Sequence, residues 1–223
     1  MSGVTYGDRV LIVSRTGAGK SELLNVLASS LRGQWLLVDN KDEFAIADVE
    51  RAHTVDALDF QNERVLHYVP TAASKEEWED LFGRAFELRD FTVVIHEVGY
   101  TCDFEPARVG PKHNQFISQG RARGLGYWAA TQRPVKLPTF ATSEPGHVFA
   151  FAEKLKRQDD HQALAHMMDL THHELADGQR GVLSQHGKHA YLWFDSAAGR
   201  VSSWRPLDDS HRARSVVRRT DDG

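Results

Sequence analysis

The segment "RVLIVSRTGAGKSELLNVL", residues 9–27, decides the fold of this 223-residue chain. An apolar run typical of a buried strand is followed by a glycine-containing loop and then by leucines at helical spacing. A phosphate-binding P-loop, G-x-x-x-x-G-K-[ST], forms in this context of strand, loop and helix. Ser14 replaces the first glycine of that pattern, but Gly17 and Gly19, the glycines closest to phosphate, are present. The segment therefore predicts a nucleotide site.

The residue types of the loop suit a triphosphate. Glycines let successive backbone N–H groups turn toward phosphate oxygens, and the helix that begins near Lys20 presents its positive end to the same anion. We expect Lys20 to reach the β- and γ-phosphates of ATP and the Ser21 hydroxyl to bind Mg²⁺. The residues expected to hold the nucleotide are Arg15, Thr16, Gly17, Ala18, Gly19, Lys20, Ser21 and Glu22.

Composition narrows the class of protein. The net charge of −4 argues against binding nucleic acid through bulk charge, although local basic strips occur at residues 120–124 and 211–219. The single cysteine, Cys102, cannot form an internal disulfide, which fits a reducing compartment. No apolar run reaches the length of about 18 residues that a membrane span requires.

Short apolar runs alternate with helical patterns along the chain. The runs that predict buried strands are residues 10–13, 36–38, 65–69, 92–95, 127–130 and 147–151. Such continuous runs favour an α/β fold with a mainly parallel central sheet flanked by helices. After a helix at 153–168 and a polar turn at 176–181, "VLSQ" and "HAYLWF" predict a C-terminal hairpin at the sheet edge. We expect one domain, residues 1–210, and a flexible basic tail, residues 211–223.

A second buried strand, in "FTVVIHEVG" (residues 91–99), ends in a carboxylate. Glu97 is expected to act as the general base that polarises the attacking water. His96 stands where hydrolytic P-loop motors usually carry aspartate. A neutral imidazole can accept a hydrogen bond from a Mg²⁺-bound water but adds no negative charge, so we expect weaker Mg²⁺ binding or slower turnover. Asp39, at the end of "WLLVD", is expected to compensate in part if its strand lies nearby.

A third element is "GRARGLGYWAATQRP", residues 120–134. Its strand ends before Gln132, which is expected to sense the γ-phosphate or orient the attacking water. Arg121 and Arg123 precede the strand, and an arginine there could stabilise the charge that develops on a neighbouring subunit's nucleotide. Two predicted strands separate the phosphate loop from the Glu97 strand in sequence, which leaves room for a strand between them in the sheet.

In combination, "SRTGAGKS", "LLVDNKDEF", "VVIHE" and "RARGLGYWAATQRP" resemble the FtsK/HerA family of DNA-translocating ATPases. The likeness runs from about residue 9 to about residue 151, with the motifs in the family's order. It implies a RecA-like P-loop NTPase fold of the additional-strand (ASCE) class. It also implies that Lys20 and Ser21 bind nucleotide and magnesium, that Glu97 is catalytic, that Gln132 is the sensor and that Arg121 is the arginine finger.

A bare motor core of this size is most similar to the genome-packaging ATPases of tailless, internal-membrane-containing viruses and phages. The resemblance implies a homo-oligomeric ring, hexamer or pentamer, that moves double-stranded DNA into a preformed capsid without reading its sequence. It further implies a capsid vertex or viral membrane protein as partner, and the host cytoplasm or the packaging vertex of the virion as location. The alternative is an assembly, secretion or conjugation ATPase that acts on protein partners.

Two further features carry weaker signals. Residues 100–116, which include Arg108, Lys112 and His113, are either a loop that grips DNA phosphates or an ordinary surface connection. The twelve histidines are expected to be scattered surface residues, because their spacing does not converge on a helix face and no cysteine pair supports zinc.

Overall fold

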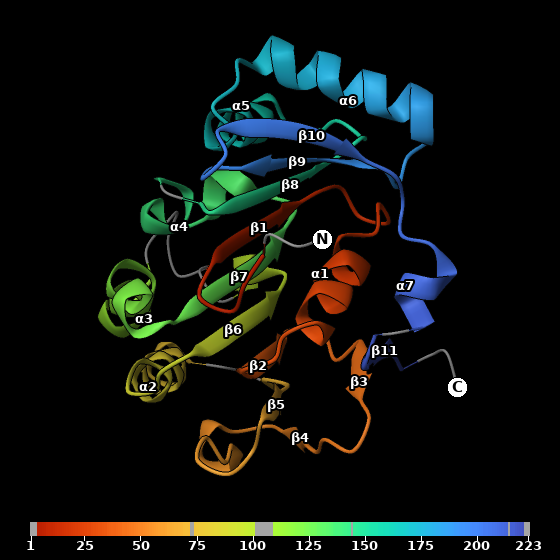
Figure 1. Ribbon diagram of the computed structural model, residues 1–223. Helices are drawn as coiled ribbons and strands as arrows, with labels where there is room; N and C mark the ends of the chain where they lie inside the picture. Colours follow the sequence, from red (N-terminus) through yellow and green to blue (C-terminus); the bar gives the residue numbers. More distant parts are fainter. Residues whose placement is uncertain (1–3, 72–73, 101–108, 144, 214, 221–223) are drawn as a thin grey trace.

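The computed structural model describes residues 4–71, 74–100, 109–143, 145–213 and 215–220. A nine-stranded sheet in the order β10-β9-β8-β1-β7-β6-β2-β5-β4 forms its centre (Figure 1). The strands from β4 to β8 in this order are parallel, and β9 and β10 are antiparallel. The bounds are β1 (Arg9–Val13), β2 (Gln34–Asp39), β4 (Arg51–Ala52), β5 (Val65–Tyr68), β6 (Phe91–His96), β7 (Gly126–Thr131), β8 (His147–Phe151), β9 (Tyr191–Asp195) and β10 (Arg200–Trp204). The mainly parallel α/β sheet and all six predicted strands are confirmed.

Alternate residues of the central strands pack on opposite faces of the sheet, as the two-residue period of a strand requires. In β1, Leu11 and Val13 join one buried cluster, whereas Val10 and Ile12 join the other. Both faces are covered by helices, which explains why the strands read as continuous apolar runs. The helices are α1 (Lys20–Ser29), α2 (Lys75–Phe86), α3 (Pro111–Gln119), α4 (Thr139–Ser143), α5 (Gln158–Met167), α6 (His172–His186) and α7 (Asp209–Ala213). Within the described residues, 3-10 turns cover Val55–Ala57, Val98–Tyr100, Gly120–Arg123 and Pro134–Lys136.

The additional strand that the sequence left room for is β7, which lies between β1 and β6. Val13 pairs with Thr131, and Ile95 pairs with Ala129, so the three strands end at the same edge of the sheet. A Cβ atom on Gly126 would stand 1.8 Å from the carbonyl oxygen of Tyr6, and only glycine fits there. The glycine-rich start of β7 thus reflects close backbone packing.

The prediction for residues 176–185 is wrong. The expected polar turn and the strand "VLSQ" both lie inside α6. A capping box of Thr171 and Glu174 starts this helix, and Leu175, Gln179 and Val182 form its buried face. The hairpin at the sheet edge exists, but β9 and β10 form it.

Part of residues 211–223, predicted to be a flexible tail, forms a strand in the structure. β11 (Val217–Arg219) pairs antiparallel with β3 (Phe44–Ile46) in a small second sheet. Val217 is buried beside α1, and the hydroxyl groups of Ser215 and Ser29 lie 3.1 Å apart. Val217, within the basic run, therefore serves as a packing residue, whereas Val216 is exposed.

The candidate DNA loop, residues 100–116, is only partly a loop. Arg108 and the rest of residues 101–108 lie outside the described residues. Pro111 begins α3, so Lys112 and His113 are helical. The His113 ring is buried and stacks on Phe82 with ring centroids 3.6 Å apart. His113 therefore packs inside the protein and is not available to DNA.

In the residues that the structure describes, no helix has the length and apolar character to cross a membrane.

The burial of His113 predicts that the protein loses stability in mild acid. Desolvation lowers the pKa of His113 from 6.5 to about 3, so the folded protein keeps a neutral imidazole that the unfolded chain protonates. This contribution to stability is complete above about pH 6.5 and falls as the pH drops toward the folded-state pKa. Between about pH 7 and about pH 5 we expect roughly 2 kcal/mol of unfolding free energy to be lost to this residue. Urea unfolding of wild type and His113→Phe at both pH values measures it, and equal pH dependence of the two proteins would contradict it.

Candidate nucleotide site

The loop between β1 and α1 has the backbone geometry of a phosphate cradle. Gly17 and Gly19 have φ angles of +77° and +101°, in the left-handed region that favours glycine, and α1 begins immediately afterwards at Lys20. Ser14 is buried, and its N–H donates to the carbonyl of Thr131 at 3.2 Å. This bond extends the pairing of β1 with β7. A serine therefore fits the position where the motif usually has glycine.

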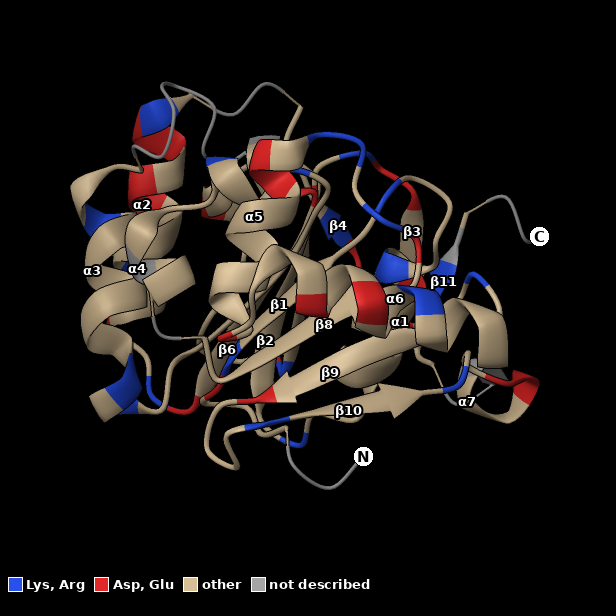
Figure 2. Ribbon diagram, turned by 90° about the horizontal axis from the view of Figure 1, so that it is seen from above, with Lys and Arg blue, Asp and Glu red and all other residues tan. Residues whose placement is uncertain are grey.

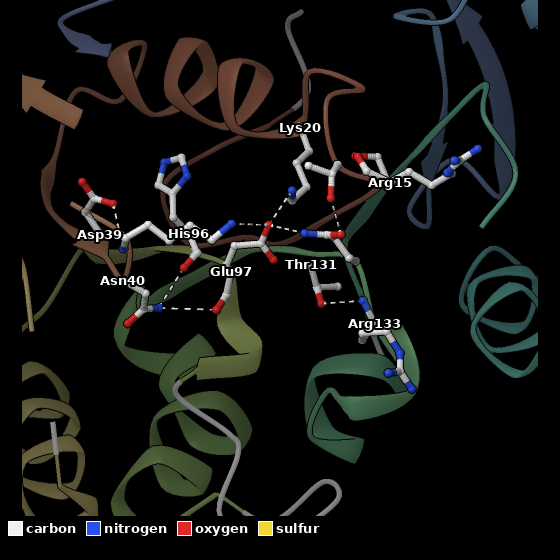
Figure 3. Close-up of polar contacts among 12 residues, drawn as sticks. Arg15, Lys20, Asp39, Asn40, His96, Glu97, Thr131 and Arg133 are labelled. Atoms are coloured by element: carbon white, nitrogen blue, oxygen red, sulfur yellow. Dashed lines mark hydrogen bonds and ion pairs between the residues drawn. The ribbon is translucent and has the colours of Figure 1, made fainter. Parts of the chain in front are cut away.

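A cavity of about 960 Å³ opens beside this loop and the first turn of α1. Of the residues predicted to hold the nucleotide, Thr16, Gly17, Gly19, Lys20, Ser21 and Glu22 line the cavity. Arg15 instead lines a smaller neighbouring cavity with Arg133 and Arg157, and its side chain points away from Glu97 in Figure 3. Ala18 is buried in the cluster around α1.

Three side chains converge on one carboxylate oxygen of Glu97 (Figure 3). Its Oε1 atom lies 2.5 Å from Lys20 Nζ and 3.5 Å from Lys41 Nζ, and it accepts a 2.9 Å hydrogen bond from Gln132 Nε2. The hydroxyl of Thr16 in turn donates to Gln132 Oε1 at 2.7 Å. The structure thus joins the phosphate loop, the expected base and the expected sensor in one network.

The electrostatic environment keeps Glu97 ionised. Burial by itself would raise the pKa of this carboxyl group, but Lys20, Gln132 and Lys41 lower it below its ordinary value. A carboxylate in this state can accept a proton or polarise a water molecule.

Glu97 also has an unusual backbone conformation. Its φ angle is +52°, a left-handed value that costs a residue with a side chain about 1–2 kcal/mol. Asn40 Nδ2 donates to the carbonyl oxygens of His96, at 2.8 Å, and Glu97, at 3.4 Å. These bonds hold the turn after β6, from which the carboxylate points at Lys20.

His96 points toward α1 and not into the cavity, contrary to the prediction (Figure 3). Its Nε2 atom lies 2.7 Å from Asn25 Oδ1, and its ring centroid lies 4.2 Å from that of Phe44. Desolvation lowers the pKa of His96 to about 4, so the neutral ring donates to the Asn25 oxygen. Among the described residues that line the cavity, His96 is absent. The side chain therefore anchors α1 to β6.

Asp39 does lie beside the β6 strand, since it pairs with His96 at the end of β2. Its carboxylate is buried and accepts backbone N–H groups of Phe44, at 2.9 Å, and Lys41, at 3.3 Å. These bonds fix the turn that brings Lys41 to Glu97. Asp39 thus shapes the site through the backbone, with its own oxygens already engaged.

Comparison with known proteins agrees with this geometry. No protein-family model matches the chain. The chain is 27% identical over 160 residues to the DNA packaging ATPase P9 of Enterobacteria phage PRD1. The aligned region covers 68% of this chain and 67% of P9. This chain is similar to a viral genome-packaging ATPase. Its P-loop NTPase fold also matches the genome packaging NTPase B204 of Sulfolobus turreted icosahedral virus 2 in complex with ATP-gammaS. That match has a TM-score of 0.70 at 16% identity and covers 92% of this chain and 100% of B204. B204 of Sulfolobus turreted icosahedral virus gives a TM-score of 0.67 at 15% identity over the same shares.

In this packaging-ATPase-like fold, Arg121 lies far from the phosphate loop of its own chain. It is exposed in the 3-10 turn before β7, whereas Gln132 follows the other end of that strand. Six strand residues separate the two ends by roughly 20 Å. Arg123, from the same turn, donates to the carbonyl of Glu87 at 3.0 Å and lies over the Phe86 ring. The structure therefore gives the two arginines different environments, with Arg121 facing solvent.

Several residues that line the cavity were missed by sequence reasoning, and two of them contact the predicted site residues. Lys41 belongs to the "LLVDNKDEF" motif, but nothing in that pattern reveals that its ammonium group turns back to Glu97. His189, before β9, places Nδ1 3.0 Å from the carbonyl oxygen of Ala18 and lines the cavity. The interpretation of the histidines as scattered surface residues is wrong for several of them, since the buried residues include His67, His96, His113, His147 and His161. Over the described ranges, no cluster of three His, Cys, Asp or Glu residues suits a metal ion.

Proposed function

We propose that this chain is an ATPase that packages double-stranded DNA into a virus particle. The similarity to packaging ATPase P9 supports the biological role, and the network of Lys20, Glu97 and Gln132 at the phosphate loop supports the chemistry. The observation that carries the proposal is that one cavity presents a phosphate-binding loop and an ionised carboxylate to the same space.

The reaction we propose begins with the triphosphate in the loop. Backbone N–H groups and Lys20 bind its phosphate oxygens, and Lys20 shifts from Glu97 toward them because a triphosphate carries more negative charge than one carboxylate. Glu97 Oε1 is then able to orient and deprotonate the attacking water, with Gln132 positioning it. Lys41 adds positive charge to the same cavity.

Magnesium fits this site as part of the nucleotide complex. The Ser21 hydroxyl lines the cavity and is an oxygen donor of the kind that Mg²⁺ takes beside phosphate oxygens. The ion, when bound, neutralises charge on the phosphates. His96 is engaged by Asn25 and is not a member of the proposed magnesium shell.

The proposed working form is a homo-oligomeric ring, hexamer or pentamer. Arg121 cannot reach its own loop across the length of β7, which supports a role toward a neighbouring subunit. DNA would be held through its phosphates, independently of sequence, so the net charge of −4 requires local basic loops. We further propose a capsid vertex or viral membrane protein as partner, and action in the host cytoplasm or at the packaging vertex.

The proposal predicts DNA-stimulated ATP hydrolysis. Duplex DNA should raise steady-state turnover, since organised subunits complete each other's sites. Stimulation should weaken steeply as salt rises and should be the same for duplexes of unrelated sequence. The measurement is phosphate release with and without duplex DNA across a salt series. Hydrolysis that is indifferent to DNA would contradict the packaging role and favour an assembly or secretion ATPase that acts on protein partners.

A further inference from the structure

The nucleotide cavity extends well beyond the phosphate loop. It follows the first turns of α1, past Glu22 and Val26, to the small sheet of β3 and β11. Figure 1 shows this sheet beside α1, and Figure 2 shows basic residues at β4 and β11. Residues of the C-terminal segment, Val217, Arg218 and Thr220 among them, line this far part of the cavity. One cavity therefore has a phosphate end and a second end closed by the C-terminal strand.

The C-terminal strand is fixed in this position. The N–H of Val216 donates to the Ser29 hydroxyl at 2.9 Å, which ties the strand to the end of α1. The N–H of Thr220 donates to the carbonyl of Glu43 at 3.0 Å. Between these bonds the strand pairs with β3, with Arg218 opposite Ala45. The wall is thus built from two strands that lie far apart in the sequence.

The chemistry of this wall suits a nucleoside. Ala45, a small half-buried residue, and the exposed Arg218 are directly opposite each other in the two strands, and both line the cavity, whereas Phe44 and Val217 are buried. Arg51, on the same wall, is already paired with Asp42 at 3.0 Å. A guanidinium group is planar and delocalised, and a purine ring can stack on it. The glycines and Lys20 at the other end are suited to the phosphates.

We propose that β3 and β11 form the nucleoside-binding wall of the ATP site and that Arg218 contacts the purine nucleoside. This inference rests on the proposed ATPase function and assigns the second half of the same site. The segment that the sequence presented as a basic tail then belongs to the nucleotide site. A polyphosphate that lacks a nucleoside should bind to the phosphate loop without contacting this segment.

The experiment compares ATP with inorganic tripolyphosphate, which lacks the nucleoside. Binding of each, with magnesium, is measured by titration calorimetry for wild type, Arg218→Ala and Ala45→Phe. The first variant removes the guanidinium and the second fills the space opposite it. We expect both variants to bind ATP about tenfold more weakly and to bind tripolyphosphate as wild type does. Arg200→Ala, an exposed strand arginine on β10 at the far edge of the sheet, is the matched control and should bind both ligands normally.

The outcomes separate the two proposals. Unchanged ATP affinity in both variants would overturn the nucleoside wall, and so would equal weakening of ATP and tripolyphosphate, which would place Arg218 at the phosphates. Thermal unfolding of each variant shows whether a loss of affinity reflects misfolding. If wild type binds neither ligand, the nucleotide site itself is wrong and the ATPase proposal fails with it.

Discussion

Replacement of Glu97 by glutamine is expected to lower ATP turnover by roughly 100- to 10,000-fold, the usual contribution of a general base. Glutamine keeps the shape of the side chain and its hydrogen-bonding capacity toward Gln132, but it cannot accept the proton of the attacking water. ATP binding should persist or tighten. The neutral side chain no longer holds Lys20 by the 2.5 Å ion pair, so the ammonium group is released to the phosphates.

Single-turnover hydrolysis and equilibrium ATP binding together test this expectation. Glu63→Gln is the matched control, because Glu63 is an exposed glutamate outside the residues that line the cavity. It should leave both quantities unchanged. A Glu97→Gln protein that hydrolyses ATP at more than about a tenth of the wild-type rate would remove Glu97 from the role of base.

Replacement of Arg121 by alanine is expected to lower DNA-stimulated turnover by about 1,000-fold, the scale of an arginine finger. ATP affinity should stay near the wild-type value because Arg121 lies at the opposite end of β7 from its own phosphate loop. Arg123→Ala is a demanding control from the same turn. It loses the hydrogen bond to Glu87 and the contact with Phe86, so we expect about 1–2 kcal/mol lower stability with turnover retained.

Mixed rings reveal whether Arg121 acts between subunits. Neither Glu97→Gln nor Arg121→Ala protein should turn over ATP alone. In a ring of head-to-tail contacts, mixing equal amounts pairs an intact Glu97 with an intact Arg121 at about a quarter of the interfaces. Turnover should therefore reappear on mixing. Mixtures as inactive as the separate proteins, with rings shown to exchange subunits, would contradict action between subunits.

The sequence was most informative where local pattern and tertiary environment agree. The central strands are buried on both faces, so their apolar runs are continuous and their positions could be predicted. The meeting of Gln132 with Glu97 could also be anticipated, because parallel strands bring their carboxyl ends to one edge. The glycines at positions 17 and 19 adopt the left-handed conformations that their spacing indicates.

Elsewhere, distant contacts decide the structure. The three-residue strand β11 exists because β3, which lies more than a hundred residues earlier, offers it hydrogen bonds, and no local pattern reveals that pairing. In α6, a capping box and a buried face outweigh glycines that look like a turn. The motif predicted that His96 contacts a magnesium-bound water, but its ring points toward Asn25 in α1. Side-chain direction after a strand is set by packing, which the motif does not record.

The position of β7 has a mechanical consequence. This strand carries Gln132 at one end and the Arg121 turn at the other, it is buried along its whole length, and it is hydrogen-bonded to β1 and β6 on its two sides. A close-packed strand held in this way resists bending, so displacement at one end is transmitted to the other. In the proposed ring, β7 would couple two nucleotide sites. Loss of the γ-phosphate near Gln132 of one subunit would displace Arg121 at the other end of the same strand, and this arginine would contact the neighbouring subunit's nucleotide. Sequential ATP hydrolysis by neighbouring subunits of the proposed ring would then follow from the stiffness of β7.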